Sequence, residues 1–81
     1  MKRQIEVDLH RLTENEAYLK LIETFNNLPK NIDRVIVVHG YHGGDTLKTM
    51  VREKFNHYLI LEKSESLNKG ETIFYIDNTR R

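Results

Sequence analysis

The chain has 81 residues, with 13 basic and 12 acidic side chains and a formal net charge of +1. This length fits one small domain with a core of modest size, and the absence of cysteine excludes disulfides and thiolate metal sites. The balanced charge does not by itself indicate a nucleic-acid binder, so any basic surface must arise from local arrangement.

The first residues include no apolar run long enough for a signal peptide or a membrane span. We therefore expect one soluble domain over residues 1–81, with its core over about 4–77, and no membrane partner. A chain without cysteine suits the reducing cytoplasm. The default expectation for the oligomeric state is a monomer.

Residues 4–10 are predicted to form a strand with one buried face, because apolar and polar side chains alternate along them. The apolar set is Ile5, Val7 and Leu9, and the polar set is Glu6, Asp8 and His10. Asp8 and His10 then lie on the polar face, roughly 6–7 Å apart along the strand.

A helix is predicted to follow, because Thr13 and Glu16 have the spacing of a capping box. Its apolar stripe is Tyr18, Leu21, Ile22 and Phe25, with spacings of one helical face. The helix should end before Pro29, since the residue that precedes proline avoids the helical conformation.

The β-branched run at 34–38 is typical of a central or fully buried strand. A glycine-rich turn follows at 39–44, with the sequence His-Gly-Tyr-His-Gly-Gly. Asp45 or Thr46 is expected to cap a second helix that ends near residues 56–57, with an apolar stripe that includes Leu47, Met50, Val51 and Phe55.

Two further strands are predicted at 58–61 and 72–76, joined by a polar loop over residues 63–70. The polar tail 77–81 is expected to be frayed. Its two arginines, like Lys2 and Arg3 at the other end, are interpreted as solvated surface charges.

The predicted order of elements is βαβαββ. Right-handed crossovers make the first three strands parallel, and the fourth strand returns antiparallel after a short connection. With both helices on one side of the sheet, the result is a two-layer α/β fold in which the polar side of the first strand faces solvent.

The carboxyl ends of the first two strands carry the candidate chemistry. Asp8 and His10 end the first strand, and His39 and Gly40 end the second. Neighbouring parallel strands end at one edge of a sheet, where open α/β sheets bind their ligands. The glycine loop also leads into a helix N-terminus, where free amides and the helix dipole attract phosphate.

Each of these features has a plainer interpretation. Asp8 and His10 also fit a solvated polar face, and Gly40, Gly43 and Gly44 also fit a tight turn from strand to helix. Tyr41 fits packing against the helix, and His42 fits an exposed loop. The loop lacks the Gly-Lys-Ser/Thr ending of a P-loop and the G-x-G-x-x-G pattern of a dinucleotide site.

Three segments in order resemble the signatures of the Smr (small MutS-related) domain family. Val7-Asp8-Leu9-His10 resembles the Leu-Asp-Leu-His-Gly motif that opens the domain. Residues 39–44, followed by Leu47-Lys48 and Val51-Arg52, resemble its His-Gly-x-Gly-x-Gly loop and the helix after it. Gly70-x-Thr72-Ile73 resembles the closing Gly-x-Thr strand. The chain is similar to a short stand-alone subgroup of this family.

The resemblance implies a two-layer α/β fold like the C-terminal domain of bacterial translation initiation factor three, with sheet order 1-2-4-3 and strand four antiparallel. The chain departs from the motifs at Arg11, where the family has glycine, and at loop residues 41–43, where many members have lysine, glycine and threonine. Its loop also carries one additional residue before Leu47. These departures bear on nuclease activity more than on the fold.

The family is associated with DNA nicking, RNA cleavage and ribosome-linked mRNA processing, so RNA, DNA and the ribosome are the partners that the resemblance implies. As an endonuclease without a cofactor, the chain would use His10 as general acid or base, oriented by Asp8, with His39 as its complementary partner. A weaker alternative gathers Asp8, His10 and His39 around a divalent metal.

A second hypothesis is a module that binds nucleic acid without cutting it, and a third is a protein-docking domain. For binding, the candidate residues are Arg11, Gly40, Tyr41, His42, Gly43, Gly44, Lys48 and Arg52. Glycines permit close approach to a phosphate, and the cationic side chains neutralise its charge.

Overall fold

The computed structural model describes residues 3–40 and 45–81. Its elements are β1 (Gln4–Asp8), α1 (Glu14–Asn26), β2 (Arg34–Val38), α2 (Thr46–Thr49), the π-helical turn η1 (Met50–Lys54), β3 (Ile60–Glu65), β4 (Glu71–Ile76) and the 3₁₀ turn η2 (Asn78–Arg80). The strands form one sheet in the order β1-β2-β4-β3. Strand β2 is parallel to β1, and β4 is antiparallel to both β2 and β3. The predicted strand order and directions are confirmed.

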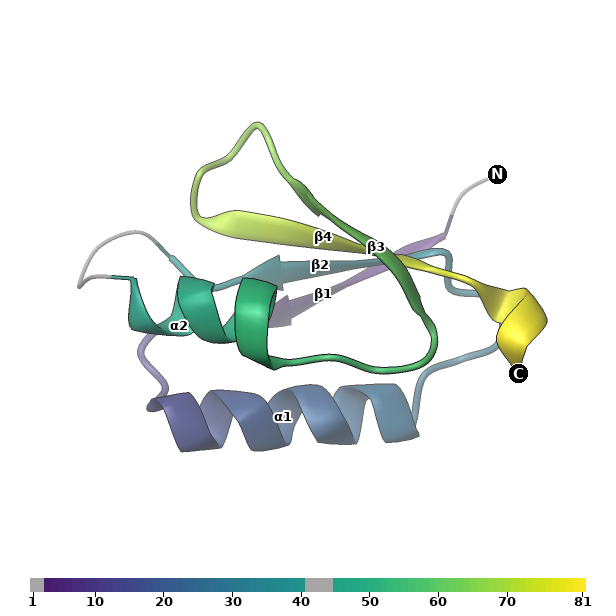
Figure 1. Ribbon diagram of the computed structural model, residues 1–81, viewed down its shortest axis with the longest axis horizontal. Coiled ribbons are helices and arrows are strands. Elements are labelled where there is room, and N and C mark those ends of the chain that lie inside the picture. Colours follow the sequence, from purple (N-terminus) through teal and green to yellow (C-terminus); the bar gives the residue numbers. More distant parts are fainter. Residues whose placement is uncertain (1–2, 41–44) are drawn as a thin grey trace.

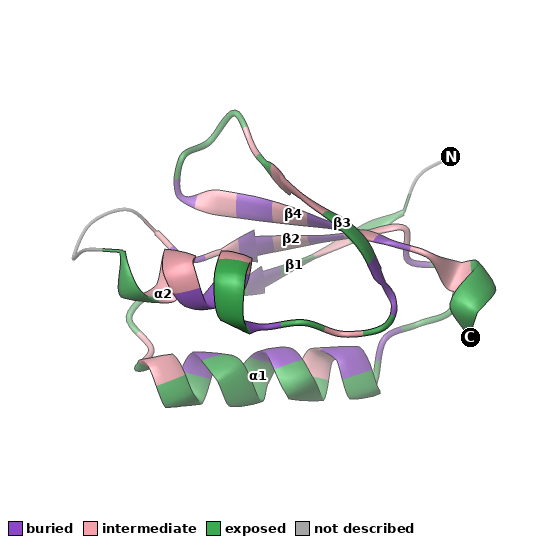
Figure 2. Ribbon diagram, in the orientation of Figure 1, coloured by how far each residue is buried: buried purple, intermediate pink, exposed green. Residues whose placement is uncertain are grey.

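Both helical segments lie on the same face of the sheet, as predicted (Figure 1). The core between the layers takes alternate residues of the strands and the inner sides of α1 and η1, and Figure 2 shows this burial on the side of α1 that faces the sheet. Its largest fully buried side chains include Leu9, Leu21, Met50, Phe55 and Phe74. The fold is therefore a two-layer α/β sandwich with one open sheet face.

Helix α1 begins with the predicted capping box. Thr13 Oγ1 accepts from the Glu16 amide at 3.2 Å, and Glu16 Oε1 accepts from the Thr13 amide at 2.9 Å. The predicted apolar stripe is partly wrong, because Tyr18 and Ile22 are each 37% exposed. The inward row is instead Ala17, Leu21 and Phe25, and Tyr18 lies at the rim, where its ring contacts the Phe55 ring edge-on at 5.5 Å.

The second helix differs from the uninterrupted helix that the sequence predicts. Only Thr46–Thr49 is α-helical, and Met50–Lys54 forms a wider π turn that closes when the Phe55 amide donates to the Met50 carbonyl at 2.8 Å. Asp45 occupies the cap position without a side-chain cap bond. The end of the turn is stabilised by the Lys63 ammonium, which donates to the carbonyls of Val51, Arg52 and Phe55.

The third strand lies later than predicted. It begins at Ile60 and continues through Glu65, into the segment expected to be a loop. Pairing with β4 explains this, because Lys63 lies opposite Phe74 and Glu65 lies opposite Thr72. An edge strand tolerates such polar residues, since one of its sides faces solvent.

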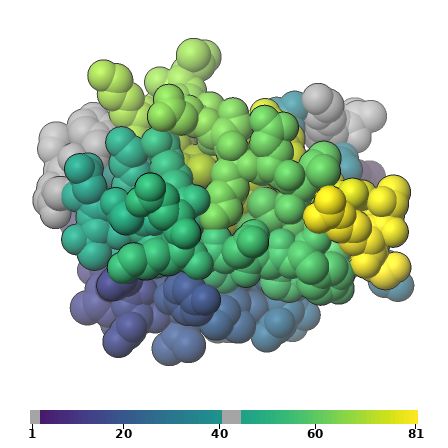
Figure 3. Space-filling view, viewed as in Figure 1, coloured from purple at the N-terminus to yellow at the C-terminus, as the bar shows by residue number. Residues whose placement is uncertain are grey.

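The C-terminal tail is anchored, so the prediction that it is frayed is wrong. Arg80 Nη1 donates to the Tyr58 carbonyl at 3.0 Å, and Arg81 Nη1 donates to the Leu28 carbonyl at 3.0 Å. In the space-filling view the yellow C-terminus packs against the neighbouring green and blue segments (Figure 3). These arginines bond to the backbone and are not simply solvated charges.

Strand β2 is central, as predicted, but it is fully buried on one side only. Val35 and Val37 face the helices with no exposed surface, whereas Ile36 and Val38 on the open face are half-buried. Glu6 and Asp8 of β1 are exposed, which confirms that the polar side of the first strand faces solvent.

No helix in residues 3–40 and 45–81 is long and apolar enough to cross a membrane.

Candidate nucleic-acid site

The two sequence motifs meet at the carboxyl edge of the parallel strand pair. Asp8 lies opposite Val38 in the register, and the Leu9 amide continues the ladder by donating to the Val38 carbonyl at 2.7 Å. Both strands point toward this edge, from which the chain leaves toward α1 and α2 (left side of Figure 1). The predicted juxtaposition of Asp8 and His10 with His39 and Gly40 is confirmed.

Asp8 and His10 form a direct, exposed pair. The strand ends at Asp8, so His10 lies in the following turn rather than within the strand as predicted. The His10 amide donates to Asp8 Oδ1 at 3.1 Å, and His10 Nδ1 hydrogen-bonds the same oxygen. Because a carboxylate only accepts, Nδ1 carries the proton and Nε2 is left with its lone pair. The side chains of His10 and Asp8 are 48% and 51% exposed, respectively.

The electrostatics of this pair favour an ionised Asp8. The side-chain hydrogen bond from His10 is the main cause that lowers the pKa of Asp8. Burial opposes it, and the His10 amide hydrogen bond and electrostatic interactions with His10 and Lys20 lower the pKa further. Lys20 of α1 donates from Nζ to the Asp8 carbonyl at 2.9 Å. Sequence reasoning missed Lys20, since contact with Asp8 depends on how α1 packs beside β1.

Gly40 lies beside His10 in a backbone conformation that favours glycine. Its φ is +76°, and a Cβ at this position would lie 3.5 Å from His10 Cβ. The amides of His39 and Gly40 both donate to the Gly70 carbonyl, at 2.9 and 3.0 Å. The strand end beside the Asp8–His10 pair is therefore fixed to the start of β4.

Arg11, which stands where the Smr motif has glycine, adopts a glycine-like backbone conformation. Its φ is +71°, and it is the one non-glycine residue with a positive φ among the described residues. L-amino acids with a Cβ reach this region at a cost of about 1–2 kcal/mol. The Arg11 side chain is exposed directly after His10.

His39 has a different environment from His10. It is only 4% exposed, and its Nδ1 lies 2.9 Å from the Gly40 carbonyl while its Nε2 lies 2.9 Å from Thr72 Oγ1. A carbonyl only accepts, so Nδ1 carries the proton and Nε2 accepts from the Thr72 hydroxyl. Burial is the main cause that lowers the pKa of His39, so the ring is neutral.

A chain of hydrogen bonds continues from Thr72 to the protein surface. Arg52 Nε donates to Thr72 Oγ1 at 2.8 Å, and Arg52 Nη1 donates to Glu65 Oε1 at 3.0 Å. The chain ties η1 to β3 and β4. Thr72 belongs to the Smr-like Gly-x-Thr segment but was not predicted as a site residue, and nothing in the sequence indicated Glu65.

The three histidine and aspartate side chains proposed for catalysis do not share one face. Thr72 belongs to the buried row of β4, so the His39 side chain that bonds to it lies on the helix side of the sheet. Asp8 belongs to the exposed row of β1, on the other side. In the parts of the chain that the structure describes, no three His, Asp or Glu side chains gather as a metal-binding group.

The predicted nucleic-acid-binding residues fall into four groups. Arg11 and Gly40 lie beside His10. Lys48 is half-buried on α2, and its charge contributes to the lowered pKa of His39. Arg52 is held by Thr72 and Glu65. Tyr41, His42, Gly43 and Gly44 lie outside the described residues.

No family model and no curated protein match this chain. Among solved structures, the chain is similar to the Smr domain of MutS2 from Thermus thermophilus, with a TM-score of 0.79 and 22% sequence identity. The superposition covers 95% of this chain and 99% of that domain. The strand order and the antiparallel fourth strand match the fold that this similarity indicates. The chain therefore has the fold of an Smr domain.

Proposed function

We propose that the chain is an Smr-type nucleic-acid-binding protein of the cytoplasm that acts on RNA, and that His10, oriented by Asp8, cleaves the phosphodiester backbone. The exposed hydrogen-bonded Asp8–His10 pair at the carboxyl edge of β1 carries this proposal. The carboxylate fixes the ring and its tautomer, and Nε2 remains as a proton acceptor. Among the described histidines, His10 is the exposed one.

In this mechanism His10 Nε2 takes the proton from a ribose 2′-hydroxyl. The 2′-oxygen then bonds to phosphorus while the bond to the 5′-oxygen breaks, and the imidazolium returns the proton to that leaving oxygen. The products are a 2′,3′-cyclic phosphate and a 5′-hydroxyl end. The Arg11 guanidinium and the Lys48 ammonium would neutralise the phosphates on either side.

His39 supports the reaction as a positioning residue in this proposal, instead of the acid–base partner that the sequence suggested. Both of its ring nitrogens are engaged, and its lowered pKa keeps the ring neutral. It holds the Gly40 backbone against Thr72, and Gly40 in turn borders His10.

Binding without cleavage is the second candidate function, and two observations favour it. A single free imidazole has to serve as both base and acid, which predicts slow chemistry. Arg11 also replaces the motif glycine directly after His10 and adds a cation there. Ribosome docking remains an outcome to test by co-sedimentation, because no contact of the described residues points to it specifically.

The test is incubation of the pure protein with single-stranded, structured and duplex RNA and with duplex DNA, each with and without a chelator. We expect RNA cleavage that persists with chelator and stops when the ribose at the cut carries no 2′-hydroxyl. His10→Ala should reduce the rate by about 100-fold or more, and Asp8→Asn should reduce it comparably or less.

Both variants should leave the unfolding free energy nearly unchanged, because the two side chains are about half exposed. Cleavage that survives deoxy substitution and stops with chelator would overturn the metal-free mechanism. RNA binding with no cleavage under any condition would establish the second candidate instead.

A further inference from the structure

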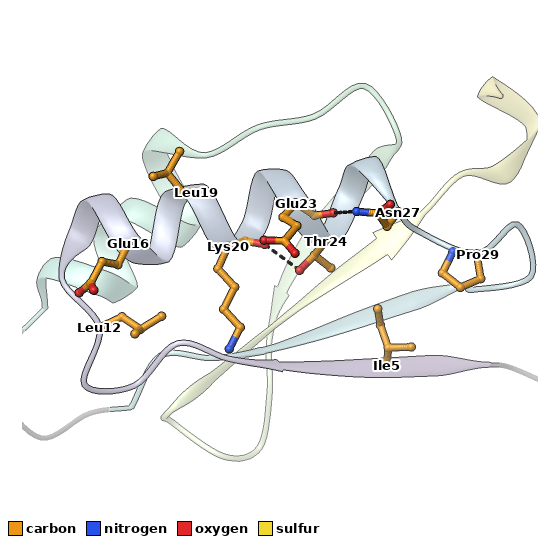
Figure 4. A pocket seen from close by; sticks show the side chains of 9 residues that line it. All are labelled: Ile5, Leu12, Glu16, Leu19, Lys20, Glu23, Thr24, Asn27 and Pro29. Carbon is orange, nitrogen blue, oxygen red and sulfur yellow. Dashed lines mark hydrogen bonds between the residues drawn. The ribbon is translucent and has the colours of Figure 1, made fainter.

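The outer edge of β1 runs away from Asp8 and carries backbone groups that the proposed RNA chemistry does not use. Strand β1 ends the sheet and pairs only with β2 in the described part of the chain. A groove of about 640 Å³ runs between this strand and α1 (Figure 4). Figure 4 shows Lys20 and Glu23 of α1 and Ile5 of β1 around this opening.

The backbone groups on this edge can be assigned from the ladder. The Arg3 carbonyl accepts from the amides of Asp33 and Arg34, and the Leu9 amide donates to Val38, so the odd-numbered residues point toward β2. Backbone direction alternates along a strand, so Gln4, Glu6 and Asp8 direct their amides and carbonyls outward. The Asp8 carbonyl is taken by Lys20 Nζ at 2.9 Å, which leaves Gln4 and Glu6 presenting both groups.

The opposite edge of the sheet is less suited to pairing. Strand β3 has a register shift between Ile60 and Glu62, and such bulges twist an edge away from further pairing. Strand β1 is regular over Gln4–Asp8, with one-to-one register against β2. It is therefore the edge of this sheet that best fits an additional strand.

The groove gives this edge a side-chain preference. Ile5, Leu12 and Leu19 supply apolar surface, and Leu19 is 65% exposed. A strand laid along β1 would point alternate side chains into the groove and the others toward the open sheet face. Apolar side chains suit the first set.

Carboxylates surround both sides of the edge. Glu6 and Asp8 are exposed on the open face of β1, and Glu16 and Glu23 line the groove from α1. The cation among the groove-lining residues is Lys20, and its amine is bound to the Asp8 carbonyl. This charge favours cationic side chains.

We propose that the outer edge of β1 binds an extended peptide segment of a partner protein, in which lysine or arginine alternates with apolar residues. The segment pairs with the backbone of Gln4 and Glu6, places its apolar side chains in the groove, and directs its cations toward Glu6 on the open face of the sheet. The chain then holds RNA at one end of the sheet and a basic peptide along its side.

The test uses the whole protein and a capped seven-residue peptide of alternating lysine and valine, followed by isotope-edited NMR. We expect the amides of Gln4 and Glu6 to shift and to become protected from hydrogen exchange. Methylating the backbone nitrogens of one alternating set of peptide residues should weaken binding by about tenfold or more, and methylating the other set should not. Equal effects of both sets would overturn backbone pairing.

Matched variants distinguish specific contacts at the β1 edge from a general effect of charge. Glu6→Lys should weaken peptide binding by about tenfold, while Glu53→Lys on η1 should leave it unchanged. Leu19→Ala should also weaken it, whereas Leu67→Ala should not, because Leu67 is fully exposed on the β3–β4 loop. These variants leave His10 and Asp8 intact, so RNA binding should persist in all of them.

Two outcomes would replace the proposal with another occupant. Protection of the Gln4 and Glu6 amides without peptide, together with dimers in sedimentation, would assign the edge to a second copy of the chain. Competition of the peptide by single-stranded RNA, with shifts at the same amides, would assign the edge to nucleic acid. Absence of any peptide binding at millimolar concentration would also reject it.

Discussion

The hydroxyl of Thr72 lies 2.9 Å from His39 Nε2 and 2.8 Å from Arg52 Nε. The ring nitrogen needs a donor and the guanidinium needs an acceptor, so one hydroxyl satisfies both at a site that is 1% exposed. Replacement of Thr72 by Val keeps the shape and removes the oxygen. It leaves two buried polar atoms without a partner, which costs about 1–3 kcal/mol for each unsatisfied group.

We therefore expect Thr72→Val to lower the unfolding free energy in urea by about 2 kcal/mol or more. Thr24→Val is the control, because the Thr24 hydroxyl bonds only to the Lys20 carbonyl within α1. Its effect should stay within about 0.5 kcal/mol. If the two variants unfold alike, the Thr72 hydroxyl contributes no more than an ordinary helix side chain.

Much of the fold could be predicted from local sequence patterns. The alternation at Ile5, Val7 and Leu9 fixed the buried face of β1, and the Thr13–Glu16 capping box located the start of α1. The start and end of β3 were wrong because its residues 62–65 are polar, and pairing with β4 rather than local preference makes them a strand.

The site was predictable in position but not in the role of each side chain. Parallel strands necessarily bring Asp8 and His39 to one edge. Which face of the sheet each side chain takes depends on contacts that are distant in sequence, such as those of His39 with Thr72 and of Lys20 with the Asp8 carbonyl. The same reason explains why Arg52 was interpreted as a phosphate ligand although it bonds inside the protein.

The stability of the protein should fall as the pH drops below about 6.5. Burial lowers the pKa of both His39 and His57 from the ordinary value of 6.5, so below it the unfolded chain binds more protons than the folded one. Their contribution is complete above pH 6.5 and is lost progressively as the pH falls toward the folded-state values.

Urea unfolding at pH 7.5, 6.5 and 5.5 measures this effect. The lowered pKa values of Asp8, Glu16 and Asp77 lie below their ordinary values of 3.8, 4.5 and 3.8, so these carboxyls do not titrate in that window. His57→Gln should retain the contribution of His39 and reduce the dependence of the unfolding free energy on pH. A flat free energy from pH 7.5 to 5.5 would contradict the prediction.

We expect Lys48 to contribute to RNA binding and Arg52 to contribute to stability. Lys48→Ala should weaken RNA binding and reduce the slope of log K against log salt by about one, with little change in stability. Arg52→Ala should instead destabilise the fold, since Thr72 and Glu65 lose their partner. Lys69→Ala, an exposed loop substitution, is the control for lost charge. Equal salt slopes for the Lys48 and Lys69 variants would remove Lys48 from the RNA site.

Arg11 should show opposite effects on stability and on binding. Its φ of +71° costs about 1–2 kcal/mol in a residue with a Cβ, and glycine avoids this cost at the expense of a more flexible unfolded chain, which offsets about 0.4–1 kcal/mol. Arg11→Gly should therefore raise the unfolding free energy by about 0.5–1 kcal/mol. Its RNA affinity should fall, because the guanidinium beside His10 is lost.

Arg11→Ala is the matched variant, because it removes the same charge and keeps the strained backbone. It should bind RNA as weakly as Arg11→Gly and gain no stability. Fluorescence anisotropy at two salt concentrations and urea unfolding measure the two properties on the same samples. A gain in stability without a loss of binding would show that the Arg11 side chain does not contact RNA. If both variants lose RNA binding and only Arg11→Gly gains stability, the strained backbone serves to place the Arg11 guanidinium at the RNA site.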